Sequence, residues 1–416
     1  MTTVGVVGLG YVGLPLAVAF ADAGCDVVAV DIDPRRVQAL EAGDSYIEDV
    51  PSEQLRTVAE RIHACTRYAD LATADAVLVC VPTPLTPNRE PDLGPLVDCS
   101  RALAEVLRSD QLVVLESTTY PGTTRERVAP LLEESGLAAG RDFHLAYSPE
   151  RVDPGRTDFT LRTTPKVIGG LTDACAERAQ ELYALICDTL VRVSTPEAAE
   201  LTKLLENIFR SVNIALVNEL AMLTDRMGID IWEVVEAAAT KPYGFMSFAP
   251  GPGMGGHCMP VDPFYLSWRA REFDMSTEFI ELAGQVNQQM PYHCVALTQR
   301  ALNDAGLPVR GARIAVLGVS YKPGVGDIRE SPALKILELL RDLGAELRYH
   351  DPHVPSLVEF DLHSLSLEDA LADADLALIV TAHPSVDHEL VSRRARLVVD
   401  LRGVTRSFSD ANVVRL

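Results

Sequence analysis

The sequence predicts an α/β protein in which two Rossmann-like, doubly wound domains are joined by a central all-helical region with one long helix. Three observations predict this class. Short β-branched runs alternate with helical segments at both ends of the chain, which is typical of a parallel sheet. A Gly-x-Gly-x-x-Gly pattern follows the first of these runs. Between the two α/β parts, residues 197–227 contain almost no turn signal.

The first segments read as strand, turn, helix and strand. Residues 4–7 form a short apolar run with β-branched side chains, and residues 14–23 form an Ala/Leu/Val helix with Pro15 in its first turn, where proline is tolerated. Gly24 ends this helix, and a second strand over residues 27–30 ends at Asp31. Further strands are expected at residues 76–81, 112–115, 144–147 and 166–168.

The middle of the chain reads as helical. A helix over residues 197–227 is much longer than the globular mean of about 11–12 residues. A second helix is expected at 230–239, a Gly- and Pro-rich loop at 242–256, and further helical pattern at 263–305. The long helix is apolar on most sides, so we expect a second copy of the chain to cover it in at least a homodimer.

The alternation of strands and helices returns after a linker turn at residues 306–311. Strands are expected at 313–317, 346–350, 375–380 and 397–401, with a helix at 331–343. The predicted domains are therefore residues 1–196, 197–305 and 306–416.

Composition narrows the class of protein. The chain has 416 residues, 47% of them apolar, and a net charge of −22, which argues against a nucleic-acid partner. No signal peptide and no apolar run of about 18 residues is recognised, so no membrane span is expected. The eight cysteines form neither a C-x-x-C pair nor a zinc-type cluster. We therefore expect no metal and a reducing, cytoplasmic location.

The glycine-rich turn Gly8-Leu9-Gly10-Tyr11-Val12-Gly13 indicates a dinucleotide site. Its glycines allow a tight turn and close approach of a pyrophosphate to the start of a helix. Asp31 ends the next strand, where an acid accepts from the ribose 2′-hydroxyl of NAD and repels the extra phosphate of NADP. Arg36 could hold such a phosphate, but a solvated helix start is the simpler interpretation of this residue.

Cys258 is the candidate nucleophile. It lies between a glycine-rich loop and Pro260, and Pro263 is expected to start a helix with Asp262 as its N-cap. A thiol beside a helix N-terminus has a lowered pKa and is a better nucleophile. The alternative, a small buried cysteine, suits the other seven cysteines better than this one.

Lys203 and Asn207 lie four residues apart on the long helix and therefore on one face. On an otherwise apolar helix, an ammonium and an amide side by side indicate a site that stabilises an oxyanion. Taken alone, a solvated polar stripe is the more frequent explanation of such a pair.

Polar residues also follow the ends of several predicted strands, where ligands bind in parallel sheets. Thr83, Thr118 and Glu150 occupy three such loops in the first domain and are expected near the nicotinamide end. In the last domain, Lys322 and Arg329 follow the first strand and are placed to meet phosphates. That loop lacks the Gly-x-Gly-x-x-Gly pattern, so a second NAD is not expected.

The chain resembles the nucleotide-sugar (UDP-glucose/GDP-mannose) dehydrogenase family over nearly its whole length. The resemblance rests on an ordered set of motifs: GLGYVGLPLA, VPTP, ESTTYPGTT, YSPERVDPG, KLLENIFRSVNIALVNE, FAPGPGMGGHCMPVDP and GVSYKPGVGDIRESPA. It implies an NAD domain, a central helical dimerisation region and a C-terminal sugar-nucleotide domain. It also implies oxidation of a C6 hydroxyl to a carboxylate in two NAD-dependent steps.

The resemblance implies residue roles. Cys258 would form a thiohemiacetal and then a thioester, and Lys203 and Asn207 would stabilise the oxyanion. Asp262, Thr118 and Glu150 would handle protons and water, with Glu150 assigned to thioester hydrolysis. The residues implied in cofactor binding are Gly8, Gly10, Tyr11, Val12, Gly13, Asp31, Arg36, Thr83, Thr118 and Arg329. Those implied in substrate binding are Glu150, Arg151, Lys203, Asn207, Lys241, Phe248, Gly251, Gly255 and Lys322.

The substrate expected from the motifs is a UDP-sugar. The stretches ERVDPG, NREPDL and KPYGF resemble the branch that acts on UDP-N-acetylhexosamines, particularly UDP-N-acetylglucosamine 6-dehydrogenases. UDP-glucose, dTDP-glucose and UDP-N-acetylmannosamine dehydrogenases are alternatives within the family. A two-electron β-hydroxyacid-type dehydrogenase is an alternative of a different class, because it shares the layout and the helix lysine but needs no cysteine. A non-catalytic nucleotide sensor is the third class of protein to consider.

Overall fold

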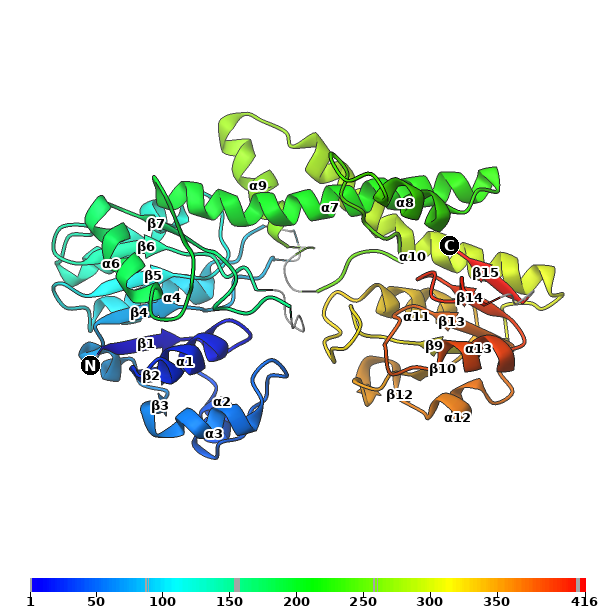
Figure 1. The fold of residues 1–416 in the computed structure, drawn as a ribbon, viewed down its shortest axis with the longest axis horizontal. Helices are drawn as coiled ribbons and strands as arrows, with labels where there is room; N and C mark the ends of the chain where they lie inside the picture. Colours follow the sequence, from blue (N-terminus) through cyan, green and yellow to red (C-terminus); the bar gives the residue numbers. More distant parts are fainter. Residues whose placement is uncertain are drawn as a thin grey trace. The chain divides into compact units, whose positions relative to one another are not determined.

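The computed structural model describes residues 2–86, 88, 90–152, 158–256, 259, 261–408 and 412–416. The chain forms two compact units: Met1–Glu206 with Phe264–Met275, and Asn207–Pro263 with Ser276–Leu416. Each unit contains a mainly parallel sheet (Figure 1). The predicted class, with two Rossmann-like sheets and a central helical region that includes one long helix, is confirmed. The three-domain boundaries stay a prediction.

The first unit is built on a sheet with strand order β3-β2-β1-β4-β5-β6-β7-β8, in which only the β6–β7 pairing is antiparallel among the described strands. The strands are β1 (Thr3–Val7), β2 (Asp26–Val30), β3 (Ile62–Cys65), β4 (Ala76–Val79), β5 (Leu112–Leu115), β6 (His144–Tyr147), β7 (Lys166–Gly170) and β8 (Leu190–Val193). The helices are α1 (Gly13–Asp22), α2 (Pro34–Glu41), α3 (Ser52–Val58), α4 (Gly94–Ala104), α5 (Ala129–Leu132) and α6 (Asp173–Tyr183). From β1, the chain adds strands first on one side (β2, β3) and then on the other (β4, β5). The point between β1 and β4 is therefore the topological switch point, where such sheets bind ligands.

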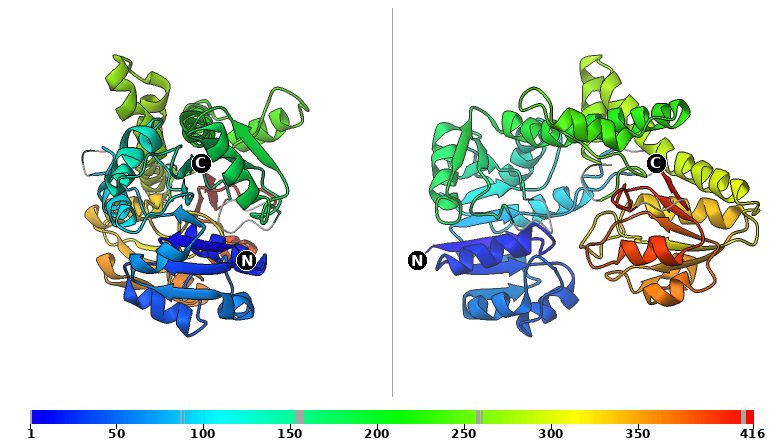
Figure 2. Two further views of the ribbon diagram at one scale, coloured as in Figure 1. Left: turned by 90° about the vertical axis from the view of Figure 1, so that its left-hand side faces the viewer. Right: turned by 45° about the vertical axis from the view of Figure 1, so that its right-hand side comes forward.

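Successive side chains of β1 enter two different hydrophobic cores, one on each face of this sheet. Val6 is buried in a cluster with Phe20 of α1, whereas Val7 is buried with Leu96 of α4. Because successive side chains of a strand point to opposite faces, helices must cover both sides, as the views in Figure 2 show. The sheet is therefore buried on both faces, and its ligands are restricted to the loops at the strand ends.

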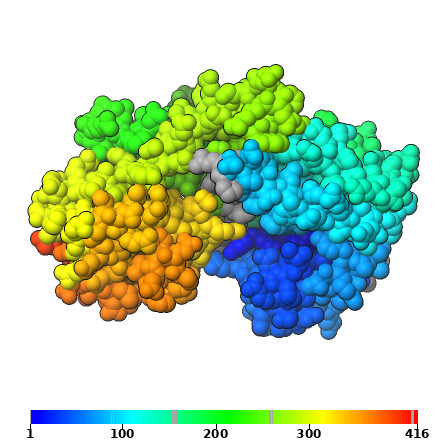
Figure 3. All heavy atoms as spheres, turned by 180° about the vertical axis from the view of Figure 1, so that it is seen from behind, coloured from blue at the N-terminus to red at the C-terminus, as the bar shows by residue number. Residues whose placement is uncertain are grey.

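The second unit is built on a parallel sheet with the order β10-β9-β13-β14-β15. The strands are β9 (Arg313–Leu317), β10 (Glu346–His350), β13 (Leu376–Ile379), β14 (Val398–Asp400) and β15 (Val413–Arg415), with a separate pair β11 (Ser356–Leu357) and β12 (Leu362–His363). The helices are α8 (Ile231–Ala239), α10 (Glu278–Asp304), α11 (Pro332–Asp342), α12 (Leu367–Leu371) and α13 (His388–Arg394). From behind, the yellow and orange segments of this unit form a continuous surface (Figure 3). Its strand order reverses direction between β9 and β13.

Two helices complete the central region, namely α7 (Pro196–Met227) and α9 (Asp262–Ala270). The long helix agrees with prediction. The helical pattern expected over residues 263–305 is divided between α9 and α10, because Asp274 adopts a left-handed φ of 53° that ends the helical geometry. In the described part of the chain, no helix combines the length and apolarity that crossing a membrane requires.

Candidate active site

The glycine-rich turn lies between β1 and α1, as predicted, and two of its glycines are fixed by close contacts. Gly8 has a φ of +90°, and a Cβ there would lie 2.6 Å from the carbonyl oxygen of Cys80. A Cβ on Gly13 would lie 1.9 Å from the carbonyl oxygen of Gly8. A Cβ on Gly10, by contrast, would meet no described atom within 4 Å. The turn is therefore closed by Gly8 and Gly13 and open at Gly10, where a pyrophosphate can approach the backbone.

The N-terminus of α1 also suits an anion. Its N-cap residue, Val12, makes no side-chain capping bond, and the first turn carries no acidic residue. The N–H groups of a helix start without such a cap attract phosphate. Tyr11, beside this turn, is 42% exposed. These features fit the pyrophosphate of NAD.

Asp31 lies at the end of β2 and is buried against the glycine-rich turn. One of its oxygens accepts from the Leu9 N–H at 2.8 Å and from the Arg36 guanidinium at 3.0 Å, and the other accepts from the Asp33 N–H at 2.9 Å. The carboxylate thus joins the strand end to the turn. The predicted ribose contact and the assignment of Arg36 stay predictions, and Arg36 is seen as the ion-pair partner of Asp31.

The loops after β4 and β5 are joined to each other. Thr83 donates its hydroxyl proton to the carbonyl oxygen of Thr118 at 2.7 Å. Tyr265 of α9 donates to the carbonyl oxygen of Thr83 at 2.8 Å and is fully buried. The structure therefore brings together two residues that the sequence placed in separate loops. Tyr265 carries no motif that singles it out in the sequence.

Glu150 and Lys203 are also brought together. The Lys203 ammonium donates to the backbone carbonyl of Glu150 at 2.7 Å. Arg151, whose substrate contact stays a prediction, pairs with Glu206 of α7 at 2.6 Å and donates to the carbonyl oxygen of Pro165 at 2.6 Å. These bonds hold the loop after β6 against the first part of α7. Glu206 was not singled out in the sequence.

Asn207 and Asp262 form a second contact between predicted residues. Asn207 donates its amide to Asp262 at 2.5 Å, and their exposed fractions are 7% and 2%. Asp262 is the first residue of α9 and not its N-cap, a shift of one position. The candidate nucleophile Cys258 lies outside the described residues.

The glycine-rich loop before Cys258 is held within the second unit. The Gly251 N–H donates to Asn218 at 2.9 Å, and a Cβ on Gly251 would lie 2.7 Å from a guanidinium nitrogen of Arg402. A Cβ on Gly255 would lie 2.8 Å from Tyr321. Phe248 lies edge-on to Phe209, with ring centroids 5.8 Å apart. The loop that was expected to line the substrate therefore contacts the segment after β9.

Arg402 is a cation that no motif in the sequence indicates. Its Nε donates to the carbonyl oxygen of Val380 at 2.7 Å, and burial lowers its pKa to about 10. It follows a short strand in a segment without a recognisable motif. Its place beside Gly251 puts a guanidinium at the loop where a substrate anion was expected.

The other predicted cations differ in their surroundings. Lys322 lies over the ring of Tyr321 at 5.9 Å, next to the contact with Gly255. Arg329 pairs with Asp327 at 2.6 Å, so its predicted phosphate contact would compete with this carboxylate. Lys241 is exposed and lies 5.2 Å from the ring centroid of Tyr243.

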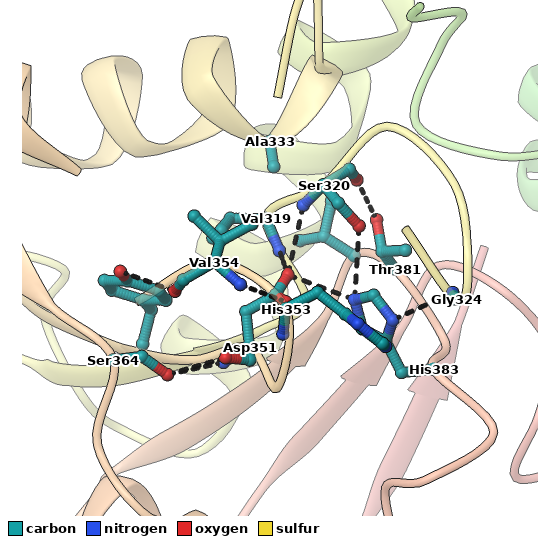
Figure 4. A network of polar contacts seen from close by, with 12 residues as sticks. Val319, Ser320, Gly324, Ala333, Asp351, His353, Val354, Ser364, Thr381 and His383 are labelled. Atoms are coloured by element: carbon teal, nitrogen blue, oxygen red, sulfur yellow. Dashed lines mark hydrogen bonds and ion pairs between the residues drawn. The ribbon is translucent and has the colours of Figure 1, made fainter. Parts of the chain in front are cut away.

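A buried polar network fixes the loop that carries Lys322 (Figure 4). Asp351 accepts from the N–H groups of Val319 and Ser320 at 2.7 and 3.1 Å. His383, which is fully buried, contacts the same carboxylate oxygen through Nε2 at 3.0 Å, and its Nδ1 accepts from the Gly324 N–H at 3.1 Å. His383 is therefore neutral, with its proton on Nε2.

This network is structural, although it contains a serine, a histidine and an aspartate. In a catalytic triad, the serine and the aspartate use different nitrogens of the imidazole. Here Ser320 and Asp351 both approach Nε2 of His383, at 3.2 and 3.0 Å. The Ser320 hydroxyl donates to the carbonyl oxygen of Lys322 at 2.9 Å. The network thus fixes the loop over residues 318–324 and does not activate a nucleophile.

An open glycine-rich turn at the switch point of a mainly parallel sheet indicates a dinucleotide-binding protein. Residues 2–187 match the NAD binding domain of the UDP-glucose/GDP-mannose dehydrogenase family, residues 197–289 its central domain and residues 315–407 its UDP binding domain. The chain belongs to this family. It is an NAD-dependent dehydrogenase of UDP-sugars.

The proteins that this chain resembles are named as dehydrogenases of different UDP-sugars. The chain is 38% identical over 412 residues to the UDP-N-acetyl-D-mannosamine dehydrogenase of Pyrococcus horikoshii, covering 97% of this chain and 96% of the relative. It is 38% identical over 353 residues to the UDP-N-acetyl-D-glucosamine 6-dehydrogenase of Pseudomonas aeruginosa, covering 84% and 83%. Among solved structures, a UDP-glucose dehydrogenase from Pyrobaculum islandicum matches with a TM-score of 0.89 and 29% identity over 99% of this chain and 97% of that one.

Proposed function

We propose that the protein oxidises the C6 hydroxyl of UDP-N-acetylglucosamine to a carboxylate, giving UDP-N-acetylglucosaminuronate, through a thiohemiacetal and a thioester on Cys258. NAD takes up the hydride released in each of the two oxidations. The observation that carries the proposal is the paired arrangement on α7, where Lys203 contacts Glu150 and Asn207 contacts Asp262. These are four of the six residues to which the resemblance gives catalytic roles.

The other cysteines support Cys258 as the nucleophile. The thiols of Cys25, Cys65, Cys80, Cys99, Cys187 and Cys294 are free, and burial raises the pKa of each. Cys175 is also free, and its thiol is fully buried and therefore inaccessible to a substrate. Buried thiols with a raised pKa are poor nucleophiles. The glycine-rich loop that leads to Cys258 is the part of the chain that suits a reactive thiol.

Each polar residue has a role that its contacts allow. The Asn207 amide has one proton directed at Asp262, which leaves its second proton for an oxyanion on the sugar carbon. Lys203 is a cation one helical turn away on the same face. Asp262 accepts protons, and Glu150 activates the water that hydrolyses the thioester. Thr118, joined to Thr83, positions water or the nicotinamide end.

The substrate diphosphate is assigned to the second unit. Lys322, on the loop held by His383, and Arg402, beside Gly251, are cations at the edge where β9 and β13 end. Ligands of doubly wound sheets bind at such a switch point. A pyrophosphate there would bridge the ammonium and the guanidinium.

A second candidate substrate is UDP-N-acetylmannosamine. It is favoured by the Pyrococcus horikoshii relative, which is as similar in identity as the Pseudomonas aeruginosa one and covers more of this chain. The motif ERVDPG supports N-acetylhexosamines as a class, but its residues 153–155 lie outside the described part of the chain. UDP-glucose is the third sugar to compare.

We also propose that the enzyme is a homodimer through α7. Seven apolar side chains on this helix are at least 40% exposed: Leu201, Leu205, Phe209, Leu216, Leu220, Leu223 and Met227. At about 100° per residue, these positions fall on one face of the helix. An exposed apolar stripe of this length is typical of a protein–protein interface.

The test is the yield of NADH per sugar consumed, measured by absorbance with UDP-N-acetylglucosamine, UDP-N-acetylmannosamine and UDP-glucose in parallel. Two NADH per sugar are expected, and the sugar with the highest kcat/KM identifies the substrate. Cys258→Ser is expected to stop full turnover. One NADH per sugar, with Cys258→Ser nearly as active as the wild type, would instead indicate a two-electron dehydrogenase.

A further inference from the structure

A lysine that no motif singled out lies buried between two carboxylates of the first unit. Lys166 is the first residue of β7, and its side chain is 3% exposed. Its ammonium lies 2.7 Å from an oxygen of Glu116 and 3.5 Å from Oε2 of Glu150, and it also donates to the carbonyl oxygen of Pro149 at 3.2 Å. A buried charge of this kind is retained only where partners compensate its desolvation.

The two carboxylates differ in their remaining partners. The second oxygen of Glu116 accepts from the Tyr183 hydroxyl, which is buried. Oε1 of Glu150 accepts from the N–H groups of Arg151 and Val152 at 2.7 and 2.6 Å. Both lone pairs of Oε1 are therefore in use, and Oε2, which faces the ammonium at a longer distance, is the oxygen of Glu150 with room for a proton.

These contacts separate the acidities of the two carboxyl groups. Burial raises the pKa of Glu116, and this outweighs the nearby Lys166 charge. Burial also raises the pKa of Glu150, but the charges of Lys166 and Lys203 and the N–H donors of Arg151 and Val152 together bring it below its usual value. Although Lys166 is closer to Glu116, Glu150 is the residue with the backbone donors that stabilise a negative charge. As the pH falls, Glu116 therefore takes up a proton before Glu150.

We propose that Lys166 is a positioning residue for the reaction, which keeps Glu150 ionised and fixes Oε2 so that Glu150 can act as the base in thioester hydrolysis. The inference rests on the proposed function of Glu150 and Cys258. In this proposal Lys166 affects the hydrolysis of the thioester, which is the last step of the reaction. It does not affect either hydride transfer.

The step balances without any further reactant than water. Glu150 Oε2 takes a proton from water while the water oxygen forms a bond to the acyl carbon. The carbon–sulfur bond then breaks, and the sulfur of Cys258 leaves with the electron pair as a thiolate. The carboxylic acid product loses its own proton to solvent, and Glu150 returns its proton to water.

Other ionisable groups contribute to the surroundings of this cluster. They are Tyr183 of α6, Lys203 of α7, and the thiols of Cys80 and Cys187. Burial raises the pKa of Tyr183, Cys80 and Cys187, so these groups stay neutral near pH 7. The charge balance of the cluster therefore depends on Lys166, Lys203 and the two carboxyl groups.

The experiment compares Lys166→Met with the wild type in single-turnover and steady-state assays with UDP-N-acetylglucosamine and NAD. The variant is expected to form two NADH per active site in a burst and then to turn over about 10²-fold more slowly, because loss of a general base costs about 10²–10⁴-fold. Mass spectrometry of the quenched variant is expected to show the acyl-enzyme. The acid limb of its pH profile is expected to move up by roughly one pH unit, since a lost opposite charge raises a carboxyl pKa.

Controls separate this role from a structural one. Lys166→Arg keeps the charge and is expected to restore hydrolysis in part. Lys335→Met removes an exposed pair with Glu338 and a contact with the Tyr292 ring, and it is expected to behave as the wild type. If Lys166→Met fails to fold, the double variant Glu116→Gln, Lys166→Met balances the buried charge. Slow hydrolysis in that double variant supports the proposal, and wild-type hydrolysis with an unshifted pH profile overturns it.

The result is distinguishable from failure of the proposed function. A wild-type enzyme that forms no NADH, or only one NADH per sugar, contradicts the thioester route itself. Two NADH per sugar in the wild type, with no burst and no acyl-enzyme in Lys166→Met, leaves that route intact and rejects the role of Lys166.

Discussion

The side-chain amide of Asn207 donates to the carboxylate of Asp262 at 2.5 Å, and both groups are almost completely buried. This bond connects α7 to the first residue of α9 across 55 positions of sequence. It orients the amide, because an asparagine with one N–H fixed has its second N–H in a defined direction. The two residues that the sequence assigned to separate roles therefore act as one unit.

We expect Asp262→Asn and Asp262→Ala to differ in stability but to agree in activity. The asparagine can still accept from Asn207, so its stability cost is expected to be below about 1 kcal/mol, while alanine leaves a buried donor unpaired at about 1–3 kcal/mol. If the carboxylate takes up protons in the reaction, kcat falls at least tenfold in both. Chemical unfolding and steady-state rates measure the two effects. A fully active Asp262→Asn enzyme would show that the carboxylate only orients Asn207.

Local sequence pattern predicts much of this fold because the buried parallel strands are almost entirely apolar. The strand at 112–115 and the first strand of the second sheet at 313–317 have the bounds that were expected. β3 (Ile62–Cys65), β8 (Leu190–Val193) and β15 (Val413–Arg415) were missed, since they are edge strands in which at most two side chains are buried. Edge strands need less apolar sequence, so their pattern is weak.

The candidate site was predictable where a motif fixes local backbone, as at Gly8 and Gly13, whose contacts leave no room for a side chain. It was less predictable where distant segments meet. Arg402 and Lys166 are ordinary basic residues in the sequence, and only tertiary packing places them beside Gly251 and Glu150. The pairing of Arg151 with Glu206 likewise depends on tertiary contact, which no periodicity reports.

His383 is expected to control substrate affinity more than turnover. It holds the loop over residues 318–324 through the Gly324 N–H and Asp351, and Lys322 of that loop is proposed to meet the diphosphate. His383→Ala leaves these buried groups unpaired, which costs about 1–3 kcal/mol. We expect the KM for the UDP-sugar to rise roughly tenfold with a smaller change in kcat. Isothermal titration with UDP in the absence of NAD measures the same effect directly.

His363→Gln is the matched control for this prediction, because His363 is an exposed histidine of the same unit. It is expected to leave KM and UDP affinity unchanged. Equal UDP affinity in His383→Ala and the wild type, with both proteins folded, would contradict the role of the network in substrate binding.

The exposed apolar side chains of α7 predict a dimer that a single charged substitution in this helix can disrupt. Leu205 is 62% exposed and Leu216 is 57% exposed, so Leu→Glu at either position costs little in an isolated chain but places a charge in an apolar interface. Light scattering after size exclusion is expected to show a monomer for Leu205→Glu and at least a dimer for the wild type. Leu365→Glu changes an exposed leucine outside this helix and is expected to keep the wild-type mass. A wild-type monomer would reject the interface.

Glu200 is expected to make stability depend on pH near neutrality. Its buried carboxyl accepts from the N–H groups of Gly122 and Thr124 at 2.6 and 2.8 Å and from the Thr124 hydroxyl at 2.6 Å. Burial outweighs these donors and raises its pKa to about 7. Because the folded pKa lies above the unfolded value of 4.5, the stabilisation is complete below pH 4.5 and is lost as pH rises through 7.

We therefore expect the free energy of unfolding to fall by about 1–3 kcal/mol between pH 5 and pH 8 through this group. Glu200→Gln cannot ionise, so the difference in unfolding midpoint between the variant and the wild type should change across this range. Glu197→Gln is the control, because the pKa of Glu197 is lowered: its burial is outweighed by the bond from Arg125, and that carboxylate stays ionised from pH 5 to 8. A wild-type curve parallel to that of Glu200→Gln at every pH would contradict a titration of Glu200 in this range.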